Sequence, residues 1–159
     1  MNSQNFTPLR ILNSKEKKRI EKELEEQFGI QKIPGILVQR GKERLFLFSG
    51  NLDEKEIKEI ESEVIVERLG IYFAKFIEEG IKLSIEGAQI LKEQIRKNIF
   101  ELPEDMLEMW MKGQDLQIST GKKGFLIIKY KEDFLGCGKA SNEKIGNFIP
   151  KSRRLKEKN

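Results

Sequence analysis

Three pairs of short, β-rich apolar runs constrain this chain more than any other feature. GILVQ and RLFLF flank a turn at 40–42, and IYFAKF and IKLS flank a turn at 78–80. GFLIIKY and FLGCGKA flank a third turn at 131–133. Short apolar runs on either side of a charged or glycine-containing turn are typical of antiparallel hairpins. The sequence therefore predicts antiparallel sheets at both ends of the chain, with helices between the strands.

The helical signals are equally local. Asn13 and Glu16 have capping-box spacing, apolar residues recur every fourth position after them, and Gly29 supplies a stop, which predicts a helix over 14–28. The remaining expected elements are a helix over 53–61, strands over 64–70 and 98–102, a helix capped by Ser84 over 85–95, a helix from Pro103 to a stop at Gly113, and a last strand within 144–154 that ends in Pro150 and a basic tail.

Composition narrows the classes of function. The chain has 159 residues, which suits one compact domain or two small ones. It has no histidine and one cysteine, Cys137, so catalytic pairs and metal sites that need imidazole or several thiolates are excluded. We therefore expect no metal, no cofactor and a non-catalytic protein. No apolar stretch is long enough to span a membrane, Met1 to Arg10 do not form a signal peptide, and the lone thiol suits a reducing cytoplasm.

The charge is distributed unevenly along the chain. The net charge is +4, but residues 1–80 hold 14 basic and 15 acidic side chains, whereas 81–159 hold 16 and 11. Residues 119–159 alone hold 11 basic and 4 acidic side chains. This gradient favours a polyanion-binding C-terminal part or, equally well, a solvated surface with a basic tail. The richness in Lys, Glu and Ile is typical of a heat-loving source, although a coding bias gives similar usage.

The Gly-Cys-Gly segment and Trp110 with its neighbouring methionines could each suggest a functional site, but the surrounding sequence favours a structural role for both. The glycines around Cys137 lie inside a predicted strand with no helix after them, which argues against a phosphate-binding loop. Cys137 itself has no histidine to activate it, so a buried strand residue is the better interpretation. Trp110 with Met106 and Met109 indicates the buried face of a helix.

A resemblance emerges from the C-terminal motifs. NIFELPEDMLEMWMKGQDL, GFLIIKY, FLGCGKA and NFIPKSRR together resemble the PUA domain, an RNA-binding module named after pseudouridine synthases and archaeosine transglycosylases. The "KG-x-D-hydrophobic" step is Lys112 to Leu116, and "LG-x-G" is Leu135 to Gly138. The resemblance covers about 95–155. RLGIYFAKF and IKLSIEGAQIL are similar to the segment that precedes PUA in small two-domain ribosome-assembly proteins of archaea and eukaryotes, and similar PUA segments accompany the rRNA cytosine-5 methyltransferases.

The resemblance implies an α+β fold in which a mixed α/β pre-PUA domain, 1–94, packs on a PUA β pseudo-barrel, 95–159. It also implies structured RNA, either rRNA or tRNA, as the ligand. By position in the family's motifs, the expected RNA-binding residues are Lys112, Gly113, Lys122, Lys123, Lys139, Lys151, Arg153 and Arg154. Two interpretations of Gly113 are equally open: it allows a phosphate to approach the backbone closely, or it only ends the helix.

Three functions remain open from the sequence. The first is a non-catalytic RNA-binding protein in rRNA maturation, ribosome assembly or RNA modification, acting beside a ribosome-assembly or RNA-modification protein. The second is the RNA-recognition subunit of a methyltransferase or pseudouridine synthase whose catalytic chain is separate. The third is a protein–protein adaptor with an incidental basic tail.

Overall fold

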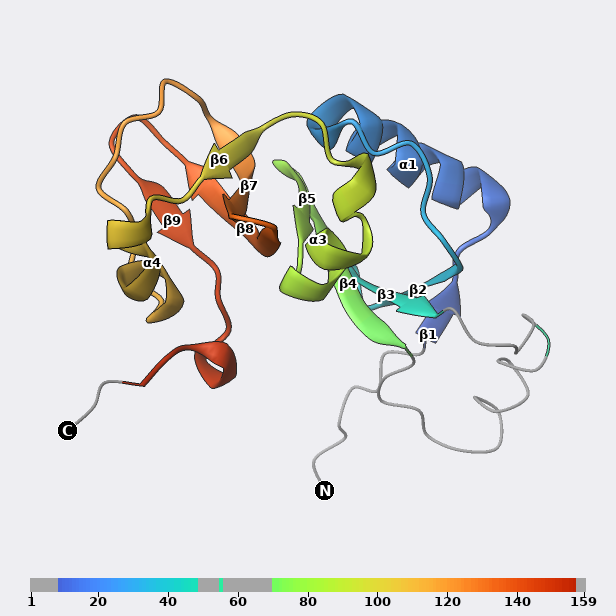
Figure 1. Cartoon of the computed structure of the whole chain (residues 1–159). Coiled ribbons are helices and arrows are strands. Elements are labelled where there is room, and N and C mark those ends of the chain that lie inside the picture. Colours follow the sequence, from blue (N-terminus) through green and yellow to red (C-terminus); the bar gives the residue numbers. More distant parts are fainter. Residues whose placement is uncertain (1–8, 49–54, 56–69, 157–159) are drawn as a thin grey trace.

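Two β-sheets lie next to each other in the computed structural model, which describes residues 9–48, 55 and 70–156 (Figure 1). The first sheet is antiparallel with the order β1-β2-β3-β4-β5, and the second has the order β6-β7-β8-β9. The first sheet consists of β1 (Leu9–Ile11), β2 (Ile36–Arg40), β3 (Arg44–Phe48), β4 (Ile71–Ile77) and β5 (Gly80–Leu83). The second consists of β6 (Ile99–Glu101), β7 (Gly124–Tyr130), β8 (Asp133–Ala140) and β9 (Ile145–Asn147). All three predicted hairpins are present, and the α+β class is confirmed.

Helix α1 (Ser14–Phe28) forms where its caps predict it. The Asn13 side chain accepts a hydrogen bond from the Glu16 amide at 2.8 Å, and the Glu16 carboxylate accepts one from the Asn13 amide at 3.2 Å. Gly29 ends the helix with a φ of +83°, in the left-handed region that suits glycine. The helix buries one face, formed by Ile20, Leu24 and Phe28, against the first sheet.

Two predicted elements are shorter in the structure than in the sequence analysis. The helix expected over 85–95 is α3 (Ile85–Ile90), followed by a 3-10 turn, η1 (Lys92–Gln94). The Gln94 side chain bonds the Gln31 and Lys32 amides and the Lys32 carbonyl, which fixes the chain in a non-α conformation. The last strand stops at Asn147, and a second 3-10 turn, η2 (Lys151–Arg153), follows Pro150.

The helix of the C-terminal part differs by one residue. It is α4 (Glu104–Met111), and Pro103 is its N-cap rather than its first helical residue. Lys112 closes the helix, and Gly113 follows with a φ of +89°. The helix expected over 53–61 and the strand over 64–70 lie almost entirely outside the described residues.

A hydrophobic core joins the two sheets. One cluster combines residues of α1, β4 and α3, such as Leu24, Phe73 and Ala88, with Phe125 and Cys137 of the second sheet. A second cluster surrounds the fully buried Trp110. The predicted domain boundary at 94/95 falls between η1 and β6, and the first cluster crosses it. The division into 1–94 and 95–159 stays a prediction, with a core that both parts share.

Candidate nucleic-acid interface

The KG-x-D-hydrophobic motif ties the end of α4 to β9. The Gly113 amide donates to the Trp110 carbonyl at 2.9 Å. Asp115 accepts hydrogen bonds from the Asn147 amide at 2.8 Å and from the Lys144 ammonium at 3.2 Å. Leu116 forms an isolated antiparallel bridge with Ile145. The motif therefore closes this end of the second sheet with backbone bonds and a partly exposed ion pair.

The LG-x-G motif lets two neighbours approach β8 closely. A Cβ atom at Gly138 would lie 2.9 Å from the Trp110 ring, so only a glycine admits the indole here. Gly136 has a φ of +82° and lies beside the Ile85 backbone of α3. These two glycines therefore serve packing and backbone geometry, as expected for glycines within a strand.

The structure places Gly113 and Arg154 in one intramolecular contact, and Lys112 precedes Gly113 at the end of α4. A Cβ atom at Gly113 would meet the Arg154 guanidinium, whose Nε donates to the Ile149 carbonyl at 2.9 Å. The Lys112 ammonium pairs with Glu108 at 3.1 Å. The close approach to Gly113 is thus made by the protein's own arginine, and the Leu155 amide fixes the following chain to the Met111 carbonyl at 2.8 Å.

Arg153 faces the first sheet's side of the molecule. Its guanidinium forms an ion pair with Glu86 of α3, and both side chains are nearly half exposed. Lys151, in the same 3-10 turn, is exposed. Because η2 replaces the expected strand, these two side chains project from a turn and do not share one strand face.

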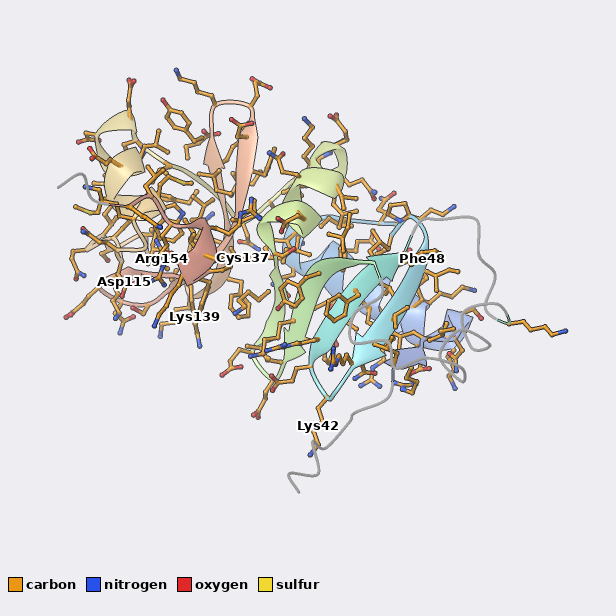
Figure 2. All side chains as sticks on the ribbon, turned by 90° about the horizontal axis from the view of Figure 1, so that it is seen from below. Lys42, Phe48, Asp115, Cys137, Lys139 and Arg154 are labelled. Atoms are coloured by element: carbon orange, nitrogen blue, oxygen red, sulfur yellow. The ribbon has the colours of Figure 1, made fainter. Side chains whose placement is uncertain are left out.

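Lys122, Lys123 and Lys139 lie at one end of the second sheet. Gly124 pairs with Ala140, and Phe125 pairs with Lys139, so the loop carrying the first two lysines adjoins the end of β8. Figure 2 labels Lys139 at this end of the strand. Lys122 and Lys123 are exposed. The Lys139 ammonium lies 3.9 Å from Glu79 in the turn between β4 and β5. The fold thus brings these three predicted lysines to one end of the sheet, where Lys122 and Lys123 are exposed and Lys139 is partly exposed beside Glu79.

The sequence analysis missed an aromatic and cationic pair beside this end of the sheet. Phe148 has 38% of its surface exposed, and the Lys82 ammonium lies 4.2 Å from its ring centroid. Burial, and next the neighbouring Lys75, lower the pKa of Lys82 below its usual range. The alternation of GIKL and the NFIP segment predicts strands, but no local signal pairs two residues so distant in sequence.

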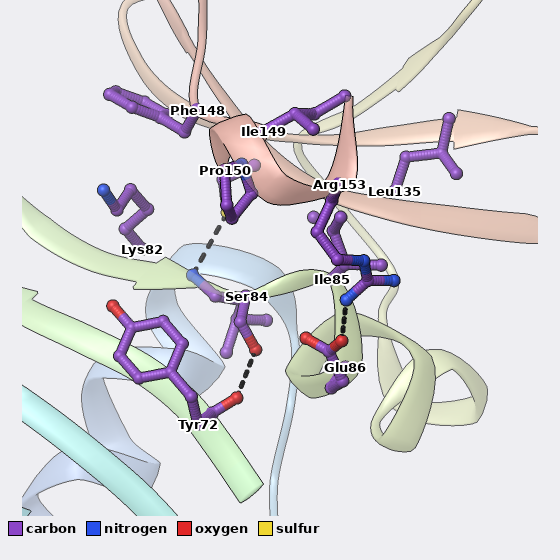
Figure 3. A pocket seen from close by; sticks show the side chains of 13 residues that line it. Tyr72, Lys82, Ser84, Ile85, Glu86, Leu135, Phe148, Ile149, Pro150 and Arg153 are labelled. Carbon is purple, nitrogen blue, oxygen red and sulfur yellow. Dashed lines mark hydrogen bonds and ion pairs between the residues drawn. The ribbon is translucent and has the colours of Figure 1, made fainter. Parts of the chain in front are cut away.

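Phe148 and Lys82 border a pocket of about 170 Å³ between the two sheets (Figure 3). Tyr72 stands on their side of the pocket, and Arg153 and Glu86 stand on the other. Cys137 also contributes to the lining, but its thiol is buried and accepts a hydrogen bond from the Leu83 amide at 3.3 Å. Burial raises the pKa of Cys137 to about 12, which leaves it protonated and unreactive.

The described residues contain no group of three or more side chains that could hold a metal ion. No helix among them is long and apolar enough to cross a membrane.

The second sheet and α4 carry the motifs that resemble the PUA domain, and a family model matches the same part of the chain. Residues 97–155 match the family model described as the methyltransferase RsmF PUA domain, which confirms the resemblance to the PUA segments of rRNA methyltransferases.

Individual relatives extend the similarity into the first half of the chain. Ribosomal RNA small subunit methyltransferase F of Psychromonas ingrahamii is 29% identical over 131 residues, which cover 79% of this chain and 26% of the relative. The Aeromonas salmonicida protein of the same name is 26% identical over 148 residues, and the Vibrio vulnificus protein is 24% identical over 144. Both of these matches cover 91% of this chain and 29% of the relative. The chain thus spans between a quarter and three tenths of these relatives' length.

Proposed function

We propose that this chain binds ribosomal RNA and supplies the RNA-recognition part of an rRNA-modifying system, without catalysing the modification itself. The observation that carries the proposal is the coincidence of two independent features. The segment that matches an rRNA methyltransferase PUA domain is also the segment that holds the excess of basic residues. Three of its lysines, Lys122, Lys123 and Lys139, lie at one end of the second sheet, where they can neutralise several phosphates together.

The non-catalytic part of the proposal is supported by the chemistry present. The chain has no histidine, and its one thiol is buried with a raised pKa, so the nucleophile of a cysteine-dependent methyl transfer is absent. The chain matches less than a third of each relative. A catalytic part supplied elsewhere is consistent with both observations. A role in ribosome assembly and a role as a protein adaptor stay open as predictions, as does a cytoplasmic location.

RNA binding is tested with the full chain. Because the two parts share a core, we do not expect either half to fold correctly when it is expressed alone. We expect a gel-shift titration to show binding to a small-subunit rRNA transcript that weakens steeply as salt rises. Crosslinking in cells then identifies the RNA: enrichment of rRNA supports the proposal, and enrichment of tRNA or of no RNA contradicts it. Incubation with rRNA and a labelled methyl donor should give no labelled nucleoside unless a catalytic chain is added.

A further inference from the structure

The pocket between the sheets has the size of a site for one ring system. Its volume of about 170 Å³ compares with the roughly 150 Å³ of an engineered cavity that admits benzene, and is smaller than the roughly 300–1,000 Å³ of typical small-molecule sites. On the side of the first sheet, the pocket is bordered by β5 and α3. On the side of the second sheet, it is bordered by residues between Phe148 and Arg153. A large cofactor is therefore a poor fit for this pocket.

One wall of the pocket is a supported aromatic ring. Phe148 keeps 38% of its surface exposed, although Phe125 packs beside it with the ring centroids 6.0 Å apart. Part of Phe148 is therefore open to solvent, and its ring can stack on a planar base once Lys82 leaves its place over the ring. Phe125 also pairs with Lys139 in the β7–β8 register. Because Phe148 packs against Phe125, the Phe148 ring lies near the basic end of the second sheet.

One cation lies over this ring, and a second lies on the opposite side of the pocket. The Lys82 ammonium now occupies a place over the Phe148 ring at 4.2 Å, where partial burial disfavours its charge and lowers its pKa. A phosphate oxygen would compensate that charge better than an aromatic face does. On the other side of the pocket, Arg153 forms an ion pair with Glu86. Once released from that pair, a guanidinium can bind a phosphate or the edge of a guanine base.

We propose that this pocket receives one unpaired nucleobase of the bound RNA, stacked on Phe148, while Lys82 moves from the ring to the adjacent phosphate. The inference rests on the proposed RNA binding and adds the class of RNA that is bound: a helix interrupted by a bulged or loop nucleotide, rather than a continuous duplex. Proteins that read RNA by sequence or shape commonly stack such unpaired bases on aromatic side chains.

The test compares two RNA hairpins that differ only by one bulged nucleotide, titrated against the full chain. The bulged hairpin should bind more tightly by roughly 5- to 140-fold, the range expected for one base stacked on an aromatic ring. Phe148→Ala should remove that difference, and Phe148→Tyr should retain most of it. Met109→Ala is the matched control, because Met109 is also an exposed apolar residue but lies on α4. This variant should retain the difference in affinity between the two hairpins.

A fluorescence measurement keeps the test decisive if Phe148→Ala does not fold. Phe148→Trp should show quenched indole emission when the bulged hairpin binds and little change with the paired one, whereas the buried Trp110 of the unmodified protein should report no change. Equal affinities for the two hairpins, with no quenching, would overturn the base-stacking inference and leave RNA binding standing. Failure to bind either hairpin would overturn the proposed function as well.

Discussion

The guanidinium of Arg154 lies against Gly113 while its Nε donates a hydrogen bond to the carbonyl of Ile149 at 2.9 Å. This contact fixes the chain after Pro150 to the end of α4, and the Leu155–Met111 backbone bond reinforces it. Two residues expected to face RNA independently therefore form one packed unit. The arginine keeps a positive charge at this place, but its position depends on a glycine.

Gly113→Ala should destabilise the fold by about 1–3 kcal/mol, because a left-handed φ costs an alanine about 1–2 kcal/mol and the methyl group also displaces Arg154. Urea unfolding measures the change. Arg154→Ala removes the obstacle, so the double variant should lose less stability than the sum of the two single changes. Strict additivity within about 0.5 kcal/mol would show that the two residues do not interact.

Replacing Lys122 and Lys123 together by alanine should weaken RNA binding and reduce the slope of log affinity against log salt by about one to two units. Both side chains are exposed, so the free energy of unfolding should change by no more than about 0.5 kcal/mol. The matched control is Lys18→Ala with Lys22→Ala, which removes the same charge from the exposed side of α1. An equal loss of affinity in both double variants would mean that net charge alone, and no particular surface, determines binding.

Glu86→Gln should strengthen RNA binding, because it releases Arg153 from its ion pair and offers a free guanidinium to phosphate. The salt slope should steepen by up to about one unit. The pair is partly exposed, so its loss should cost no more than about 1 kcal/mol of stability. Glu26→Gln on α1 gives the same change in net charge and should have a much smaller effect on affinity. A weaker complex for Glu86→Gln would show that the carboxylate itself contacts the RNA.

The stability of the protein should fall as pH rises from about 9 to about 12. Burial raises the pKa of Cys137 from 9.0 to about 12, so in this window the unfolded chain loses the thiol proton and the folded chain retains it. The unfolded state then binds fewer protons, and the free energy of unfolding decreases by at most about 1.4 kcal/mol per pH unit. Subtracting the pH profile of Cys137→Ala isolates this effect from the titration of lysines and tyrosines. Parallel profiles for the two proteins would exclude a buried, protonated thiol.

The elements that sequence predicted well are those whose signals are local. The caps of α1 and the turns of the three hairpins depend on residues within a few positions of each other, such as Asn13 and Glu16. Strand β1 was not predicted, because three residues carry no readable alternation and the strand exists through its pairing with β2. Helix α3 is shorter than its apolar pattern suggests, since the Gln94 side chain bonds to the chain around Lys32, which no local pattern reveals.

In the candidate site, too, features that depend on residues close in sequence could be predicted, whereas contacts between distant residues could not. Charge counting indicated a basic C-terminal part, and the resemblance to PUA domains added Lys122, Lys123 and Lys139 as expected RNA-binding residues, which stay a prediction. The Phe148–Lys82 contact required the two sheets to pack together, and so it could not be predicted. The intramolecular roles of Arg153 and Arg154 were likewise invisible, since Glu86 and Gly113 are remote from them in the chain.

The core shared by the two sheets has a consequence for communication along the chain. Because Phe125 and Cys137 pack with Leu24 and Phe73, local opening of the second sheet exposes residues that the first sheet depends on. A ligand bound at the second sheet and the pocket should then slow amide hydrogen exchange in β2 and β3, because Leu37 and Leu45 belong to the same cluster but do not line the pocket. Ligand binding would then be detected in the first sheet as slower amide exchange, without any change in the position of its strands.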